Sequence, residues 1–94
     1  MSGGDVGAKA GKLAVMVGGD AKVLDVVKPL MQCYSANIAH MGAAGFGQHT
    51  KMANQVIIAG QMIGVVEGLM YGHKAGVPLP TMVELLSKGA ASSL

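Results

Sequence analysis

The segment from residue 48 to residue 75 constrains the fold more than any other part of this sequence. It is apolar and holds only three formal charges, on Lys51, Glu67 and Lys74. Gly76 and two nearby prolines end its helical pattern. A helix of this length spans roughly 40 Å at about 1.5 Å per residue, which is more than a globule of 94 residues needs. We therefore expect one long helix with partners beyond a small core.

Glycine recurs at every fourth position in the second half of this segment, at Gly60, Gly64, Gly68, Gly72 and Gly76. Each glycine costs about 1 kcal/mol relative to alanine inside a helix, so a run of them needs a compensating reason. Successive members are offset by about 40° around the helix, which creates a winding groove that another backbone can approach closely. We predict that the first four glycines form a packing interface between domains or between the subunits of a homodimer or larger homo-oligomer.

Membrane helices that pair through GxxxG motifs show the same spacing. A spanning helix needs about 20 predominantly apolar residues. The candidate span contains the polar residues Gln55, Gln61 and Glu67. Because polar groups are expensive in a bilayer, we favour helix packing in water and expect no membrane partner.

Composition argues against several function classes. The net charge is +2, all basic residues are lysine, and there is no tryptophan. Without guanidinium groups or a platform of stacking rings, we expect no nucleic-acid partner. Hydrophobic residues make up 51% of the chain and charged residues only 13%, against roughly 25% charged residues in an average soluble domain. Some of this apolar surface should therefore meet a partner.

Cysteine and histidine give no sign of a metal site. Cys33 is the only cysteine, so neither an internal disulfide nor a CxxC site is available, and we expect its side chain to be buried. The spacing of His40, His49 and His73 matches no zinc site. We therefore expect no metal cofactor.

The first half of the chain alternates strand and helix signals. A short apolar run at 13–17 ends at a glycine pair and predicts a buried strand. Asp20 is a suitable N-cap for a helix over 21–32, although Pro29 lies inside that range. A second strand is expected at 38–41. The connection is longer than the roughly 12 residues that a parallel crossover requires, so we predict a βαβ unit and an α/β fold.

The two ends of the chain carry weaker signals. The glycine-rich residues 1–7 have no core of their own, and plain flexibility is one interpretation of them. Ser2-Gly3-Gly4 offers an alternative, because a hydroxyl and free backbone N–H groups can bind an anion. Near the other end, Thr81-Met82-Val83-Glu84 has the pattern of a capping box. It predicts a short helix that ends near Gly89.

A second glycine-containing motif precedes the long helix, Gly45-Phe46-Gly47-Gln48-His49-Thr50-Lys51. It is neither a dinucleotide fingerprint nor a Walker A loop, because both need glycine at position 50. What remains is a helix start followed by Lys51, Asn54 and Gln55, which share one helix face. On residues alone, Lys51 is either a solvated lysine or a group that moves protons from a covered position.

The two motifs taken together resemble those of the β-hydroxyacid dehydrogenase family, which includes 3-hydroxyisobutyrate dehydrogenase, tartronate semialdehyde reductase and the glyoxylate and succinic semialdehyde reductases. The first motif is Ser2-Gly3-Gly4-Asp5-Val6-Gly7-Ala8-Lys9-Ala10-Gly11, and the second runs from Gly45 to Gln55. The resemblance implies that Ser2, Gly3 and Gly4 bind the substrate carboxylate. It also implies that Lys51 is the catalytic acid/base and that Asn54 orients the substrate.

The resemblance further implies two domains. Residues 1–44 would be the end of a Rossmann-type dinucleotide-binding domain, and residues 45–94 an interdomain helix with the beginning of an all-α domain. The expected activity is NAD(P)-dependent hydride transfer between nicotinamide and a small 3-hydroxy acid or semialdehyde. The 6-phosphogluconate dehydrogenase branch fits less well. That branch has His-Asn where this chain has Asn54-Gln55, and this chain has no arginine for a sugar phosphate.

One departure from the family pattern limits the expected activity. The usual GxGxxG half of the dinucleotide domain does not occur in these residues, so we expect the 94-residue chain alone to be inactive. With no secretory signal pattern, we expect a cytoplasmic location. The alternative function is a non-catalytic dimerisation or small-acid-binding module that uses the glycine groove.

Overall fold

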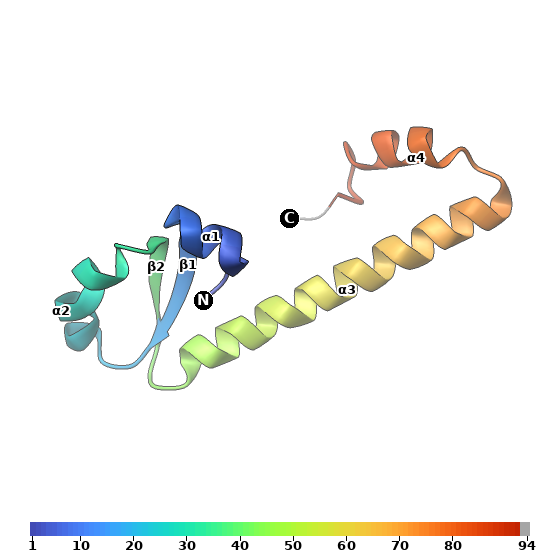
Figure 1. The fold of residues 1–94 in the computed structure, drawn as a ribbon. Helices are drawn as coiled ribbons and strands as arrows, with labels where there is room; N and C mark the ends of the chain where they lie inside the picture. Colours follow the sequence, from blue (N-terminus) through green and yellow to red (C-terminus); the bar gives the residue numbers. More distant parts are fainter. Residues whose placement is uncertain (93–94) are drawn as a thin grey trace. The chain divides into compact units, whose positions relative to one another are not determined.

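The computed structural model describes residues 1–92 and shows a mixed α/β chain (Figure 1). In chain order, the elements are α1 (Gly4–Ala10), β1 (Leu13–Gly18), α2 (Ala21–Met31), β2 (Ser35–Gly42), α3 (Phe46–Ala75) and α4 (Leu79–Leu86). The chain divides into two compact units, one over residues 1–55 and one from Val56 onwards.

The first unit contains the predicted parallel βαβ arrangement. β1 pairs with β2 in parallel, from Leu13 opposite Ser35 to Gly18 opposite Gly42. The crossover between them contains α2. The fold-class prediction is therefore confirmed, although β2 begins at Ser35 rather than at Ile38.

A small core holds this unit together. Among the described residues, the buried hydrophobic side chains are Leu13 and Val15 of β1 and Leu24 of α2. Alternate residues of a strand point to the same face, and α2 contributes its covered face through Leu24. The hydroxyl of Ser35 is also buried, and it donates a hydrogen bond to the carbonyl of Met31. The apolar periodicity of the sequence therefore identified the correct strand and helix.

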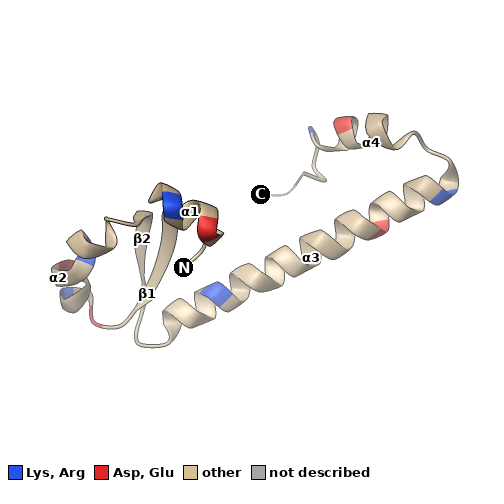
Figure 2. Ribbon diagram, in the orientation of Figure 1, with Lys and Arg blue, Asp and Glu red and all other residues tan. Residues whose placement is uncertain are grey.

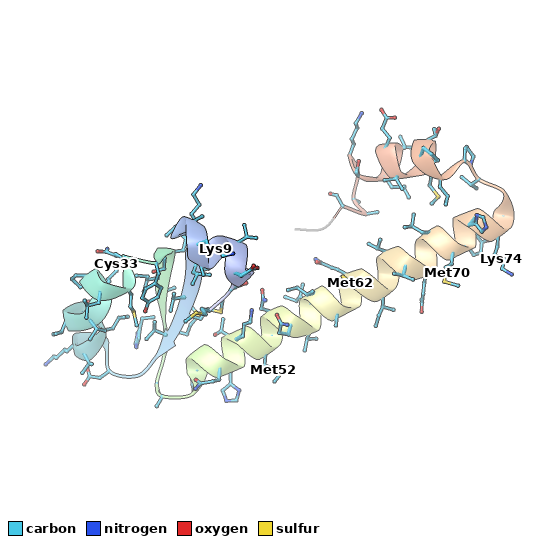
Figure 3. The ribbon with its side chains drawn as sticks, in the orientation of Figure 1. Lys9, Cys33, Met52, Met62, Met70 and Lys74 are labelled. Carbon is cyan, nitrogen blue, oxygen red and sulfur yellow. The ribbon has the colours of Figure 1, made fainter. Side chains whose placement is uncertain are left out.

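The N-cap prediction for α2 is confirmed, because the Asp20 carboxylate accepts a hydrogen bond from the Lys22 N–H at 2.8 Å. Pro29 lies inside the helix, which continues to Met31. The prediction that Cys33 is buried is wrong. This side chain is exposed in the turn after α2 (Figure 3), where its only hydrogen-bond contact within the described residues is the Pro29 carbonyl.

The glycine-rich opening forms structure that the sequence did not predict. Residues from Gly4 onwards form α1, which ends at Gly11 in the left-handed conformation, with φ 69°. The N–H groups of Gly11 and Lys12 bond back to the carbonyls of Ala8 and Gly7. A glycine at this position closes a helix without steric cost. The interpretation of residues 1–7 as a flexible terminus is therefore wrong.

The second unit contains the remainder of α3 and the short helix α4. The predicted short helix is present as α4, which ends at Leu86 rather than near Gly89. The prediction that a capping box at Thr81 starts it is wrong, because α4 begins at Leu79 and its N-cap is Pro78. Pro80 is accommodated in the first turn, where a helix does not need the missing N–H. The long helix is confirmed, although it begins at Phe46 rather than at residue 48.

Most of α3 has few charges and little cover. Figure 2 shows only isolated charged positions along it. By length and composition alone it could cross a membrane, with a mean hydropathy of 1.2 over an 18-residue window of which 6% is buried. Met62 and Met70 project from it (Figure 3), and both are exposed. The absence of a membrane partner stays a prediction.

Candidate functional site

The start of α3 contacts the end of β1 through two glycines. A Cβ atom added to Gly18 would lie 2.6 Å from the Ala43 carbonyl oxygen and 2.9 Å from the Gly47 backbone nitrogen. A Cβ atom added to Gly47 would overlap the Met16 carbonyl oxygen. All of these neighbours are backbone atoms, which cannot rotate away as a side chain can. The two backbones therefore approach more closely than any residue with a side chain allows.

Lys51 and Asn54 lie on the covered face of α3. Gly47 is buried, and Thr50, Lys51 and Asn54 are half-buried. These positions follow the i, i+3, i+4, i+7 pattern of one helix face. By contrast Met52, next to Lys51, is 65% exposed. Lys51 therefore belongs to the side of the helix that faces the rest of the first unit.

Local hydrogen bonds support this part of the helix. The Thr50 hydroxyl donates to the Phe46 carbonyl at 2.8 Å, and the His49 N–H donates to the Gly45 carbonyl at 3.0 Å. The Asn54 amide donates to the Gln55 side chain at 3.1 Å. Lys51, Asn54 and Gln55 were predicted to share one helix face. Lys51 and Asn54 are half-buried, whereas Gln55 is exposed.

The Ser2-Gly3-Gly4 segment is attached to β1. The Ser2 N–H donates to the Ala14 carbonyl at 2.8 Å, and the Ala14 N–H donates to the Ser2 carbonyl at 3.0 Å. Gly3 and Gly4 then turn the chain with φ values of 131° and 60°, which L side chains rarely adopt. This loop is therefore held in a defined conformation immediately before α1.

The loop and the start of α3 lie along the same edge of β1. Ala14 directs both of its backbone hydrogen-bonding groups to Ser2, away from β2. Residues two apart in a strand direct these groups to the same edge, so the Met16 carbonyl, against which Gly47 packs, lies on that edge as well. Ala14 and Met16 are about 7 Å apart along the strand. The fold thus brings the two predicted motifs to neighbouring positions.

No ion pair neutralises Lys51 within residues 1–92, where the recorded pair is the exposed one between Lys88 and Glu84 at 3.7 Å. In the same range, no three His, Cys, Asp or Glu side chains lie close enough to hold a metal ion. His40 instead contacts the Gly19 carbonyl oxygen through Nε2 at 2.6 Å. The site consequently offers a lysine, an amide, a hydroxyl and backbone N–H groups.

The predicted interface glycines lie in two different environments. A Cβ atom on Gly72 would lie 2.7 Å from the Met82 sulfur, so Gly72 packs against α4 of the same chain. Gly60, Gly64 and Gly68 have open space around them. Gly64 and Gly68 line an apolar groove of about 680 Å³ between α3 and α4, whose walls include Leu69 and Leu86.

The fold and the site together define the end of a Rossmann-type α/β unit that continues into a long helix, and known proteins match it. Residues 1–42 match the family profile described as the NAD binding domain of 6-phosphogluconate dehydrogenase. Residues 45–94 match the profile described as NAD-binding of NADP-dependent 3-hydroxyisobutyrate dehydrogenase. The chain belongs to the β-hydroxyacid dehydrogenase family.

Individual relatives agree with this assignment. The chain is 46% identical over 93 residues to the probable mitochondrial 3-hydroxyisobutyrate dehydrogenase-like protein 1 of Arabidopsis thaliana. The match covers 99% of this chain and 28% of that protein. It is 43% identical over 93 residues to the 2-hydroxy-3-oxopropionate reductase of Escherichia coli K12, covering 99% of this chain and 32% of the relative. The chain therefore spans about a third of the length of these relatives.

A solved structure shows the same arrangement of the backbone. The 3-hydroxyisobutyrate dehydrogenase of Mycobacterium tuberculosis, determined with L-serine, matches with a TM-score of 0.92 and 34% identity over 98% of this chain and 32% of that chain. The α/β architecture is thus shared with an enzyme of the family.

Sequence reasoning missed Gly18 as part of the site. The signal was present in the glycine pair that closes the first strand and in Gly47, a residue with poor helix propensity near a helix start. The sequence does not reveal that Gly18 and Gly47 contact each other.

Proposed function

We propose that the protein containing this chain is an NAD(P)-dependent oxidoreductase that acts on a small 3-hydroxy acid or semialdehyde, with Lys51 as general acid/base. The observation that carries the proposal is the position of Lys51. It lies on the covered face of α3, one helical turn after Gly47 contacts β1. Ser2 pairs with the same edge of that strand. The proton-transfer group and the candidate carboxylate site are therefore both positioned by β1.

The Ser2-Gly3-Gly4 loop is the proposed site for the substrate carboxylate. Backbone N–H groups and a hydroxyl form charge-assisted hydrogen bonds with a carboxylate. The left-handed glycines shape the backbone there without side chains that would obstruct a ligand. Because Lys51 has no carboxylate partner within residues 1–92, its charge also favours an anionic substrate. Asn54 is proposed to orient the substrate through its side-chain amide.

A nicotinamide cofactor is proposed to bind beyond the carboxyl end of β1. Open α/β sheets bind ligands beyond the carboxyl ends of their strands. In this chain β1 ends at Gly18, which Gly19 follows, and β2 ends at Gly42. A Cβ atom on Gly19 would meet nothing within 4 Å. The Phe46 ring lies against Gly42, where a Cβ atom would be 2.7 Å from Cδ2, and the backbone at 43–47 lies against Gly18. Gly19 is therefore the open one of these three positions.

Lys51 moves the proton in the proposed reaction. When bound, NAD(P) supplies or accepts the hydride. In the direction of reduction, the Lys51 ammonium donates a proton to the carbonyl oxygen of the semialdehyde. In the direction of oxidation, its neutral amine accepts the proton of the substrate hydroxyl. Holding the carboxylate at the loop keeps the reacting oxygen near Lys51, which replaces an encounter in solution by a fixed geometry.

Lys51→Ala in the complete natural protein tests the proposal. We expect kcat to fall by about 10²- to 10⁴-fold, the usual contribution of a general acid/base, while the Kd for NADH or NADPH changes little. The assay uses NADH and NADPH with glyoxylate, succinic semialdehyde and tartronate semialdehyde, and it uses NAD⁺ and NADP⁺ with 3-hydroxyisobutyrate. Lys74→Ala is the matched control, because Lys74 is an exposed lysine at the far end of the same helix. Near-normal activity of the Lys51 variant would refute the assignment.

The apolar surface of α3 favours a further role for the second unit. Val56, Ile57 and Ile63 are all more than half exposed. We infer that this surface, with Gly60, Gly64 and Gly68, contacts a second copy of the chain. If Lys51 proves dispensable, dimerisation or the binding of a small acid is the alternative function.

A further inference from the structure

We propose that Gly18 and Gly47 are positioning residues for the reaction, because their backbone contact sets where Lys51 lies relative to the Ser2-Gly3-Gly4 loop. This inference rests on the proposed function of Lys51. It concerns neither the proton transfer itself nor the substrate. The contact between these two glycines holds the amine of Lys51 at its working distance.

Steric space explains why both positions are glycine. Neither Gly18 nor Gly47 has a positive φ, so both backbones are in conformations that alanine adopts freely. In a helix, alanine would also be the better residue at position 47. The one observed feature that excludes a side chain is the close approach of backbone atoms, namely those of Met16, Ala43 and Gly47. Glycine at these sites therefore serves the contact between β1 and α3.

The contact controls Lys51 because the helix is rigid over one turn. Gly47 and Lys51 are four residues apart on the same face of α3. A Cβ atom on Gly47 would overlap the Met16 carbonyl, so the first turn of α3 must move away from β1. Ser2 would stay, because its two hydrogen bonds are to Ala14. The amine would thus move relative to the carboxylate loop.

Gly47→Ala in the complete natural protein is the first test. A displacement of about 1 Å at a reacting group is sufficient to lower the rate about 100-fold. We expect kcat to fall by that amount, with a Kd for NADPH within about threefold of the unchanged protein. Gly89→Ala is the matched control, because a Cβ atom there would make an ordinary contact at 3.9 Å. Gln48→Ala, an exposed change in the same helical turn, is a second control. Both controls are expected to keep normal kcat.

The kinetic isotope effect separates positioning from general damage to the fold. When product release limits the rate of the unchanged protein, misplacing Lys51 makes proton and hydride transfer the slower steps. The rate ratio between the ordinary and the 4-deuterated reduced cofactor then rises. Loss of folded enzyme would lower the rate and leave this ratio unchanged. A fall in kcat that matches the loss of folded protein, measured by circular dichroism, would overturn the inference.

A second variant and a crystal structure test the same contact if Gly47→Ala cannot be assayed. If Gly47→Ala does not fold, Gly18→Ala tests the same contact from the strand, because its Cβ atom would lie 2.9 Å from the Gly47 nitrogen. A crystal structure of either variant gives a result that needs no substrate. We expect the α3 backbone at residues 47–51 to shift from β1 while Ser2 stays paired with Ala14. An unshifted Lys51 would overturn the inference.

The same assays distinguish this inference from the proposed function. If Lys51→Ala is inactive and both glycine variants behave like the controls, the positioning inference fails and the function stands. If Lys51→Ala is fully active, the proposed function fails. In that case a shift of α3 in the variant crystal structure still reports whether the glycine contact sets the position of residue 51.

Discussion

Residues 1–55 and the described residues from Val56 onwards are stabilised in different ways. The first unit buries Leu13, Val15 and Leu24 between a sheet and a helix. In the second unit no hydrophobic side chain is buried within the described residues, and the only buried position is Gly72. The sequence is strongly apolar in both. The difference teaches that apolar composition does not by itself make a core. A single pair of helices is so small that most of its side chains stay at the surface.

Substitution of Leu24 should give the largest effect. It is 8% exposed, whereas Leu30 in the same helix is 71% exposed. We expect Leu24→Ala to lower the free energy of unfolding by about 2–5 kcal/mol and Leu30→Ala to change it by about 0.5 kcal/mol or less. Urea-induced unfolding, followed by circular dichroism, measures both. Equal effects of the two variants would mean that the first unit has no core of its own.

The second unit should be completed by a second copy. A Cβ atom at Gly64 or Gly68 would meet nothing within 4 Å, and replacing both residues with leucine fills part of the groove between α3 and α4. We expect the mass measured by light scattering to fall by half, because the leucines block the approach of the partner helix. Gly89→Leu is the control. An unchanged mass would remove the groove from the interface. A protein that is monodisperse only in detergent would instead favour a membrane.

The N-cap of α2 should give the smallest effect. Asp20→Ala removes the hydrogen bond to the Lys22 N–H, and loss of such a cap costs about 1 kcal/mol. Asp25→Ala, an exposed change later in the same helix, is the control. Thermal unfolding of both variants measures the difference. A similar Tm for the two would show that packing against the sheet, and not the cap, determines the stability of α2.

The sequence predicted those features that depend on neighbouring residues. The 13–17 strand, the Asp20 cap and the long helix each leave a local pattern of apolar, capping or breaking residues. The same local logic failed at the chain's prolines. Pro78 and Pro80 follow the end of α3 as predicted, but they also stand at the beginning of α4, where the sequence pattern predicts a start at Thr81. Proline stops a helix that precedes it and also suits the first turn of a helix that follows.

What the sequence by itself determined is therefore the order of the elements from β1 onwards and the candidate residues Lys51, Asn54 and Ser2. Only the tertiary structure decided that Ser2 pairs with Ala14 and that Gly47 packs against Met16 on the same edge of β1. It also decided that Gly72 packs against Met82. These contacts join residues that are distant in the chain or separated by a turn. Local periodicity reports which face of an element is apolar, but it carries no information about which backbone will lie against that face.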